Sequence, residues 1–280
     1  MINTLDIEPT TICNLNCPFC FGPIVNREET EIDLQLWKDA FFKFRNMGVE
    51  NVVISGGEPL IYHRIFELIY YLKDLNYNIV LSTNGRYKEK LFEIAPYCDW
   101  ISLPIDGISS NVNRFMRTDN YPFSEILSTA LELKKKHSKL SIKIGSVVTQ
   151  HNYQEIINIG DVLKENLNCF DVWKIYQYTP RRKQINNYNS LYISDMLFSD
   201  LSIQIRNRLA SVMKIVFSSN QSRRNAYAFI YQSGDANIAN VGDNYGDVYV
   251  GNISCFDNIN FQLVNKLLNN NHYSNYTNTY

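Results

Sequence analysis

The sequence predicts an α/β protein, a partial (β/α)6 TIM-like barrel followed by a small C-terminal α+β extension. Two observations indicate this fold. Short apolar runs alternate with helix-period segments over the first two-thirds of the 280 residues, a pattern typical of parallel strands joined by helical crossovers. Right-handed crossovers of this kind curl a sheet toward a full or partial barrel. After Pro180 the alternation stops, and polar, turn-rich sequence follows.

Six strand and helix units follow one another along the chain. The helices between the strands carry apolar residues three and four positions apart, and the clearest one extends from an Asp33 cap to Gly48. Beyond Pro180 the sequence indicates one further helix over 194–209 and strand-like segments at 214–218 and 226–231. The six expected strands are rich in Ile, Val and Leu and lie at 5–7, 51–55, 78–82, 100–103, 140–148 and 172–176.

We expect a barrel core at residues 1–180, an extension at 181–268 that covers the substrate side, and a disordered polar tail at 269–280. The content of 45% hydrophobic and 20% charged residues is that of an ordinary globular protein. A net charge of −1 gives no bulk attraction to nucleic acid or to an anionic membrane. Because the N-terminus lacks the apolar run of a signal peptide and no stretch is long enough to span a bilayer, we expect a cytoplasmic location.

Three cysteines are crowded into one loop after the first expected strand. Cys13, Cys17 and Cys20 are separated by three and then two residues, while the other three cysteines are scattered. Clustered cysteines in a reducing compartment are typical of metal or redox sites. Thiolates bind the irons of [4Fe-4S] clusters, normally four per cluster, so a local set of three leaves one iron open. The alternative is structural zinc, which requires four ligands, and no fourth cysteine or histidine follows at finger-like spacing.

The C-x3-C-x2-C spacing, with the aromatic Phe19 before the last cysteine, resembles the signature of the radical S-adenosylmethionine (SAM) superfamily. The resemblance implies that Cys13, Cys17 and Cys20 hold a [4Fe-4S] cluster whose open iron binds SAM. It further implies that reductive cleavage of SAM gives a 5′-deoxyadenosyl radical that abstracts hydrogen from a substrate. An external reductant such as flavodoxin or ferredoxin is the implied partner.

Polar motifs end the following strands, at the edge where the functional loops of a parallel β/α barrel lie. The segment after the second strand, Ser55-Gly56-Gly57-Glu58-Pro59, has two glycines that permit close backbone approach. It resembles the superfamily's GGEP motif, which implies a contact with the SAM amino group. Matching positions imply contacts with the ribose, the carboxylate and the adenine. The SAM-binding residues predicted in this way are Phe19, Gly56, Gly57, Glu58, Pro59, Ser82, Asn84, Ser102, Asp106, Arg117 and Val148.

Beyond these motifs the chain resembles the viperin family of radical SAM nucleotide dehydratases. The resemblance lies in Ser219-Asn220-Gln221 followed by Tyr227, in Trp173-Lys174 and in Lys143. It implies that Lys174 and Tyr227 are catalytic, Tyr227 as a hydrogen donor to a radical intermediate. The alternative for Tyr227 is a packed tyrosine whose hydroxyl is satisfied within the protein.

Other positions depart from the families that the chain resembles. Asn51, Gly145 and Val172 stand where viperin has Lys, Asn and Arg, and the loss of such charge-assisted contacts argues against a nucleoside triphosphate. The region from Tyr231 to Gly251 loosely resembles the SPASM-type extension of peptide-modifying relatives, without the cysteines that bind their auxiliary clusters. One cluster is therefore expected.

The sequence thus favours a single-cluster radical SAM enzyme that acts on a small molecule or a short peptide. A viperin-like nucleotide dehydratase is the second hypothesis, and a non-catalytic zinc-binding module is the third. Lys143 and Lys174, on neighbouring expected strands, suit one anionic group such as a carboxylate or a single phosphate. For Arg223 and Arg224 the sequence leaves open whether they add to this site or are solvated surface charge. Neither a nucleic acid nor a membrane is an expected partner.

Overall fold

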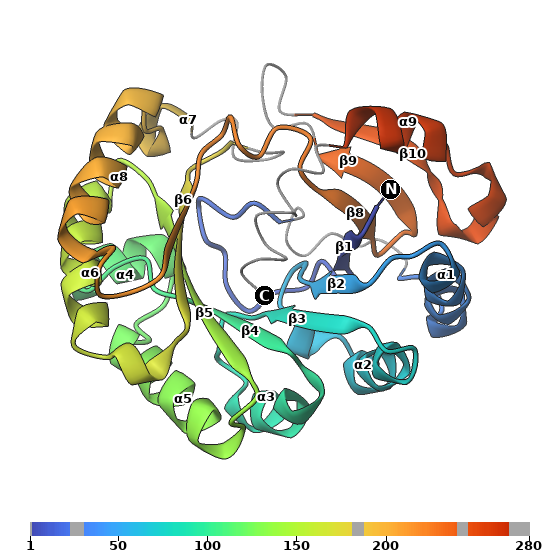
Figure 1. Cartoon of the computed structure of the whole chain (residues 1–280), viewed down its shortest axis with the longest axis horizontal. Coiled ribbons are helices and arrows are strands. Elements are labelled where there is room, and N and C mark those ends of the chain that lie inside the picture. The colour runs from blue at the N-terminus through green and yellow to red at the C-terminus, as the bar shows by residue number, and fades with distance from the viewer. Residues whose placement is uncertain (1, 23–30, 181–187, 240–245, 269–280) are drawn as a thin grey trace.

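The computed structural model describes residues 2–22, 31–180, 188–239 and 246–268. One curled sheet, with strand order β10-β9-β8-β1-β2-β3-β4-β5-β6-β7, forms its centre, and the helices lie outside the curl (Figure 1). In this order β7 and β10 are the two edges, so the sheet is an open, partial barrel. The strands are β1 (Thr4–Glu8), β2 (Asn51–Ile54), β3 (Asn78–Ser82), β4 (Trp100–Pro104), β5 (Ser141–Val148), β6 (Val172–Gln177), β7 (Ile215–Ser218), β8 (Ala228–Tyr231), β9 (Asp235–Ala239) and β10 (Asp247–Asn252).

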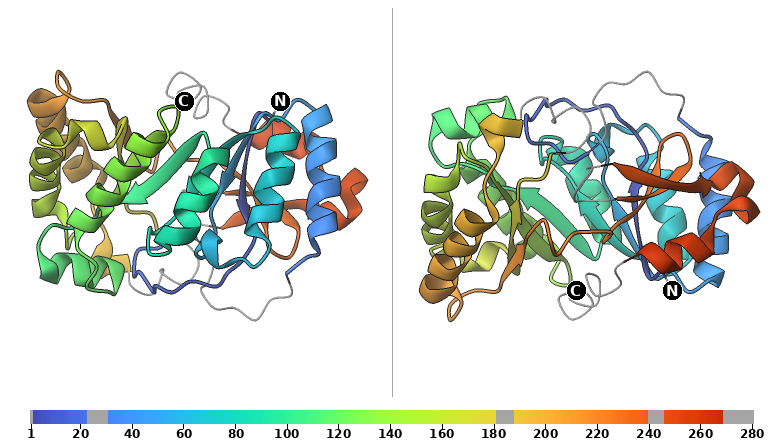
Figure 2. Two further views of the ribbon diagram at one scale, coloured as in Figure 1. Left: turned by 90° about the horizontal axis from the view of Figure 1, so that it is seen from below. Right: turned by 90° about the horizontal axis from the view of Figure 1, so that it is seen from above.

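The helices cover the convex side of this sheet, as the views from below and from above also show (Figure 2). In α1 the Asp33 side chain accepts a hydrogen bond from the Gln35 backbone N–H at 2.7 Å, which caps the first turn. No described helix has the length and apolar character needed to cross a membrane. The α-helices are α1 (Leu34–Asn46), α2 (Ile65–Asp74), α3 (Lys88–Ile94), α4 (Ser110–Arg117), α5 (Phe123–Lys136), α6 (Ile156–Lys164), α7 (Tyr188–Leu191), α8 (Asp195–Leu209) and α9 (Phe261–Leu267).

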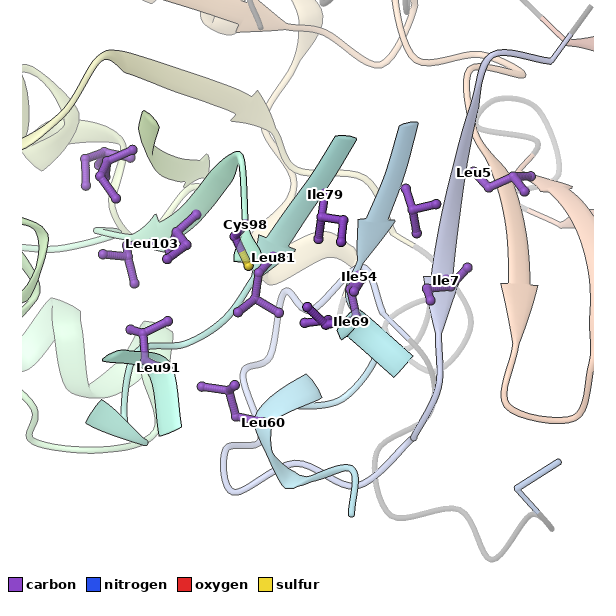
Figure 3. Close-up of a cluster of buried hydrophobic side chains, with 14 of the residues drawn as sticks. Leu5, Ile7, Ile54, Leu60, Ile69, Ile79, Leu81, Leu91, Cys98 and Leu103 are labelled. Atoms are coloured by element: carbon purple, nitrogen blue, oxygen red, sulfur yellow. The ribbon is translucent and has the colours of Figure 1, made fainter. Parts of the chain in front are cut away.

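Alternate residues of the strands face the helices and form the core. Figure 3 shows Ile54, Leu81 and Leu103 beside Ile69 of α2 and Leu91 of α3, and all five are at most 1% exposed. Because successive strand residues point to opposite faces, the residues between these apolar ones belong to the other side of the sheet. We call this side the inner face. Among its residues are Asp6, Val53, Val80, Ser82, Ser102, Lys143, Lys174, Tyr176 and Phe229.

The segment after Pro180 extends the same sheet at both of its ends. β7 lies parallel beside β6, whereas β8 lies parallel beside β1, with Asp6 opposite Phe229. β9 and β10 continue from β8 as antiparallel strands. The predicted fold class is confirmed, and the helix expected over 194–209 is α8. The expected tail at 269–280 lies outside the described residues.

Candidate active site

The cysteine loop leaves the carboxyl end of β1, at the edge where the functional loops of parallel barrels lie. Cys17 is buried, and Cys13 and Cys20 are half-buried. Burial raises the pKa of all three thiols, that of Cys17 to about 11, and in each case the neighbouring charge of another of the three raises the pKa further. Cys17 affects Cys13, Cys20 affects Cys17 and Cys13 affects Cys20. The three sulfur atoms therefore converge on one region.

This convergence fits a cube-shaped cluster. In a [4Fe-4S] cluster each thiolate binds a different iron. The three thiols must therefore lie around the cluster, and they need not be close enough together to bind one metal ion. Within the described part of the chain, no three Cys, His, Asp or Glu side chains are grouped closely enough to surround one metal ion. Metal binding requires deprotonated thiols. Burial favours the protonated form of the three cysteines, and iron bound at this site would displace those thiol protons.

The two glycines of the motif after β2 bring this loop against the cysteine loop. The Gly57 N–H donates to Thr10 O and the Glu58 N–H donates to Ile12 O, both at 2.8 Å. A β-carbon on Gly57 would lie 2.1 Å from Ile12 O, and one on Gly56, where φ is +110°, would lie 2.6 Å from Thr10 O. The two glycines were predicted to allow a ligand to approach the backbone closely. In the structure they allow the backbone of the cysteine loop to approach closely.

The Glu58 carboxylate is 1% exposed and already accepts three hydrogen bonds within the protein. Its donors are Thr83 Oγ1 at 2.6 Å, the Asn84 N–H at 2.7 Å and the Leu60 N–H at 3.2 Å. Burial raises the pKa of Glu58, and these hydrogen bonds act in the opposite direction. The side chain therefore ties the loop after β2 to the end of β3, while its predicted contact with the SAM amino group stays a prediction.

Arg117, the last residue of α4, forms a buried ion pair with Asp106, which follows β4. Asp106 is fully buried and also accepts a hydrogen bond from the Val147 N–H at 2.7 Å. The Arg117 Nη1 atom lies 4.0 Å from Cys17 Sγ, and its guanidinium carbon lies 5.2 Å from the centre of the Phe19 ring. The pair thus holds a positive charge directly against the cysteine loop, where a SAM carboxylate was predicted to meet Arg117.

Asn84 is the predicted residue that reaches the cysteine loop from β3. Its side-chain nitrogen donates to Asn14 Oδ1 at 2.7 Å and lies 4.0 Å from Cys13 Sγ. Ser82 and Ser102 are paired across β3 and β4 on the inner face, and Pro59 is buried at the start of a 3-10 turn.

Val148 does not share the inner face with the other predicted SAM-binding residues of the strands. It is completely buried in the core on the helix-covered side, together with Ile144, because it stands an odd number of residues from Lys143 along β5. Val147 occupies the inner position beside Tyr176. The predicted contact of Val148 with adenine stays a prediction.

Lys143 and Lys174 are brought together on the inner face from neighbouring strands. They are only 7% and 2% exposed. Burial, followed by the charges of Lys143 and Arg223, lowers the pKa of Lys174 well below its ordinary value, and Asp6 acts in the opposite direction. Lys143 makes no hydrogen bond or ion pair with any residue in the described part of the chain. A buried cation such as Lys143, without a partner among the described residues, is typical of a site that binds an anion.

Tyr227 lies on the same side of the barrel, just before β8. Its ring is 6.0 Å from that of Phe21 and 5.8 Å from that of Phe229, measured between centroids. Burial raises the pKa of its hydroxyl, and the nearby charge of Arg223 lowers it. The structure thus brings both predicted catalytic residues, Tyr227 and Lys174, into one neighbourhood with Arg223.

Sequence reasoning missed two residues that build this end of the barrel, Thr83 and Asn14. Thr83 stands between the predicted Ser82 and Asn84 and binds Glu58, and Asn14 stands beside Cys13 and accepts from Asn84. Their position next to predicted residues was the available signal. Cys98, Cys169 and Cys255 were expected to form no second site, and the first two are buried free thiols while Cys255 is exposed.

Two curated relatives share this arrangement of sequence over most of the chain. An S-adenosylmethionine-dependent nucleotide dehydratase of Flammeovirga pacifica is 26% identical over 239 residues, which cover 79% of this chain and 77% of the relative. The S-adenosylmethionine-dependent nucleotide dehydratase RSAD2 of Oncorhynchus mykiss is 27% identical over 243 residues, which cover 79% of this chain and 65% of the relative.

Among solved structures, SuiB of Streptococcus suis bound to its precursor peptide SuiA resembles this fold with a TM-score of 0.69 at 19% identity. That match covers 84% of this chain and 59% of SuiB, and at this identity it shows the fold alone. The sequence model of the Radical SAM superfamily matches residues 7–163, more than half of the chain, and includes the cysteine loop and the motifs that end β2 to β5. The chain therefore belongs to the radical SAM superfamily and is an enzyme that uses SAM and a [4Fe-4S] cluster.

Proposed function

We propose that this enzyme acts on a nucleotide and removes one of its hydroxyl groups as water. The observation that carries the proposal is the set of buried cations on the inner face. Lys143 and Lys174 lie on the neighbouring strands β5 and β6, and Arg223 is close enough to lower the pKa of Lys174. Lys143 has no hydrogen-bond or ion-pair partner in the described part of the chain, and a buried cation is costly unless a ligand supplies the opposite charge. A phosphate-bearing substrate supplies it.

The comparisons support a nucleotide over a peptide. Three curated relatives that each align with 79% of this chain are nucleotide dehydratases, whereas the likeness to SuiB concerns the fold. The sequence alone placed the nucleotide dehydratase second, because Asn51, Gly145 and Val172 replace residues of the viperin pattern. The inner-face cations and the relatives together support placing it first.

The remaining groups of the inner face suit the other parts of such a substrate. Phe21, Tyr227 and Phe229 form a triangular cluster of rings with centroids 5.8 to 6.3 Å apart, and aromatic rings are groups against which a planar base can pack. When bound, the cluster supplies the electron that cleaves SAM and starts the radical reaction. In this proposal Lys174 holds the anionic end of the substrate, and Tyr227 donates a hydrogen atom to the substrate radical. The tyrosyl radical that this leaves is returned to tyrosine by one electron from the external reductant and one proton from solvent.

The test is formation of 5′-deoxyadenosine by the anaerobically reconstituted, reduced enzyme with SAM and each common nucleotide in turn. We expect one nucleotide to raise the rate well above the slow uncoupled rate and to yield a product lighter by one water. A matched reaction with Lys174→Ala should retain the uncoupled rate and lose the stimulation. Stimulation by a peptide and by no nucleotide would contradict the proposal.

A further inference from the structure

The side chain of Arg223 is buried on the same side of the barrel as Lys174. It is 4% exposed, although the sequence Arg223-Arg224 left both residues open as solvated surface charge. Its Nη2 atom donates to Thr179 Oγ1 at 2.5 Å, to Asn220 Oδ1 at 2.8 Å and to Gln177 O. The guanidinium is therefore fixed in place by neutral acceptors at the end of β6 and in the turn after β7.

These contacts leave much of the guanidinium unused. All of its side-chain hydrogen bonds within the described residues come from Nη2, and the buried Nε atom has no acceptor. No carboxylate in the described part of the chain lies within ion-pair distance of Arg223. A buried, oriented cation with an unsatisfied N–H is costly in a folded protein, and that cost is removed when an anion binds.

Arg223 and Lys174 approach the same ring. The Arg223 guanidinium carbon lies 5.7 Å from the centre of the Tyr176 ring, and Lys174 Nζ lies 4.9 Å from it. Lys143 is also close enough to lower the pKa of Lys174. The three cations are thus gathered around one point of the inner face, and their combined charge suits a compact dianion.

Among the described strand residues, the inner face below these cations offers no further cation, and its one charged side chain at the level of Val53 and Val80 is the anionic Asp6. Val172, opposite Lys143 in the sheet, packs with Val80, Trp100 and Val216. Asn51, nearer the amino end of the strands, is occupied by hydrogen bonds with the side chains of Asn3 and Asn78. A chain of three phosphates would have to lie against this apolar floor, which desolvates charge without compensating it.

We propose that Lys143, Lys174 and Arg223 form a binding site for one phosphate group, so that the substrate is a nucleoside monophosphate. This inference rests on the proposed function and narrows it from nucleotides in general. A phosphate carries nearly two negative charges at neutral pH and accepts the paired N–H groups of a guanidinium in one plane. Arg223 is then the residue that sets the length of the phosphate chain.

The experiment compares nucleosides with their mono-, di- and triphosphates as stimulators of 5′-deoxyadenosine formation by the reconstituted enzyme. We expect the monophosphate to act at the lowest half-saturating concentration. Arg223→Gln should raise that concentration roughly ten- to a hundredfold, as expected for loss of a charge-assisted contact, and leave the unphosphorylated nucleoside unaffected. The exposed neighbour gives the matched control, Arg224→Gln, which should behave as the wild type. If Arg223→Gln does not fold, Arg223→Lys is the second variant. It keeps the charge but loses the paired N–H groups of the guanidinium, so it should raise the half-saturating concentration of the monophosphate by a smaller factor.

The outcomes separate this inference from the proposed function. Strong stimulation by a triphosphate with a weak response to the monophosphate would overturn the inference and support the proposed function. If no nucleotide stimulates the enzyme, the proposed function fails, and inorganic phosphate becomes the probe. Thermal stabilisation of the wild type by phosphate, absent in Arg223→Gln, would still support the site, and equal responses of the two proteins would overturn it.

Discussion

The buried pair of Asp106 and Arg117 offers the sharpest test of how this site is held together. Asp106 is fully buried, and the Arg117 side chain is 15% exposed. Replacement of Asp106 by alanine leaves the guanidinium charge buried beside Cys17 without its counter-ion, and it leaves the Val147 N–H without its acceptor. Both losses act on the same few residues, so their effects are not additive.

Removal of one partner from a buried ion pair costs about 3–5 kcal/mol. For a domain of this size, each kcal/mol corresponds to a shift of roughly 2 °C or more in the melting temperature. We therefore expect Asp106→Ala to melt about 6–10 °C below the wild type and to retain less iron after reconstitution, because Arg117 also contacts the cysteine loop.

The measurement is anaerobic thermal unfolding followed by circular dichroism, with iron content determined in parallel. The control is Glu67→Ala, which removes an exposed carboxylate paired with Arg64 and should leave the melting temperature unchanged. In the double variant Asp106→Ala/Arg117→Met no charge is left unpaired, so much of the lost stability should return. A melting temperature of Asp106→Ala within about 1 °C of wild type would refute the assignment of this pair as a structural anchor.

Three further predictions concern other parts of the site. Single alanine variants of Cys13, Cys17 and Cys20 should lose SAM cleavage, whereas variants of the other cysteines retain it, and cleavage by the triple variant would disprove the cluster assignment. Gly57→Ala places a methyl carbon 2.1 Å from Ile12 O and should lower the melting temperature and weaken SAM binding measured by calorimetry, while Gly145→Ala, with no neighbour closer than 3.6 Å, should melt normally. The pKa of Lys174 is lowered in the folded state, so the unfolded state binds more protons between that pKa and about 10.4. Lys174→Met should therefore be more stable than the wild type at pH 7. If this difference in stability does not shrink as the pH rises toward 10, the cause assigned to the pKa shift is wrong.

The strands of the barrel were predictable because their sequence pattern is local. Apolar runs such as 78–82 and 172–176 mark β3 and β6 to within one residue, since a strand covered by helices must be apolar on that side. The pairing of β8 with β1 was not predictable in this way. It joins Asp6 to Phe229, which lie far apart in the sequence, and no local pattern encodes such a partner.

The site residues show the same division between local and distant information. Glu58, Asp106 and Arg117 were identified from their resemblance to superfamily positions, and the donors that bind the two carboxylates could not be predicted in this way because they come from other elements. Thr83 binds Glu58 from the end of β3, and Arg117 binds Asp106 from the end of α4. Val148 shows how sensitive a strand position is, because a displacement of one residue exchanges the inner face for the core.

The inner-face cations connect the stability of the barrel with its binding of substrate. Burial and like charges hold the pKa of Lys174 below its ordinary value in the free protein, and a bound phosphate would raise it again through the opposite charge. Between these two pKa values, binding takes up a proton, so the affinity for the phosphate-bearing ligand should fall as the pH rises through that interval. Calorimetric titrations in two buffers with different ionisation enthalpies measure this uptake, and Lys174→Met should show less of it than the wild type. Equal heats in the two buffers across the pH range would show that Lys174 does not change its protonation when the ligand binds, and the buried ammonium would then have to be charged already in the free protein.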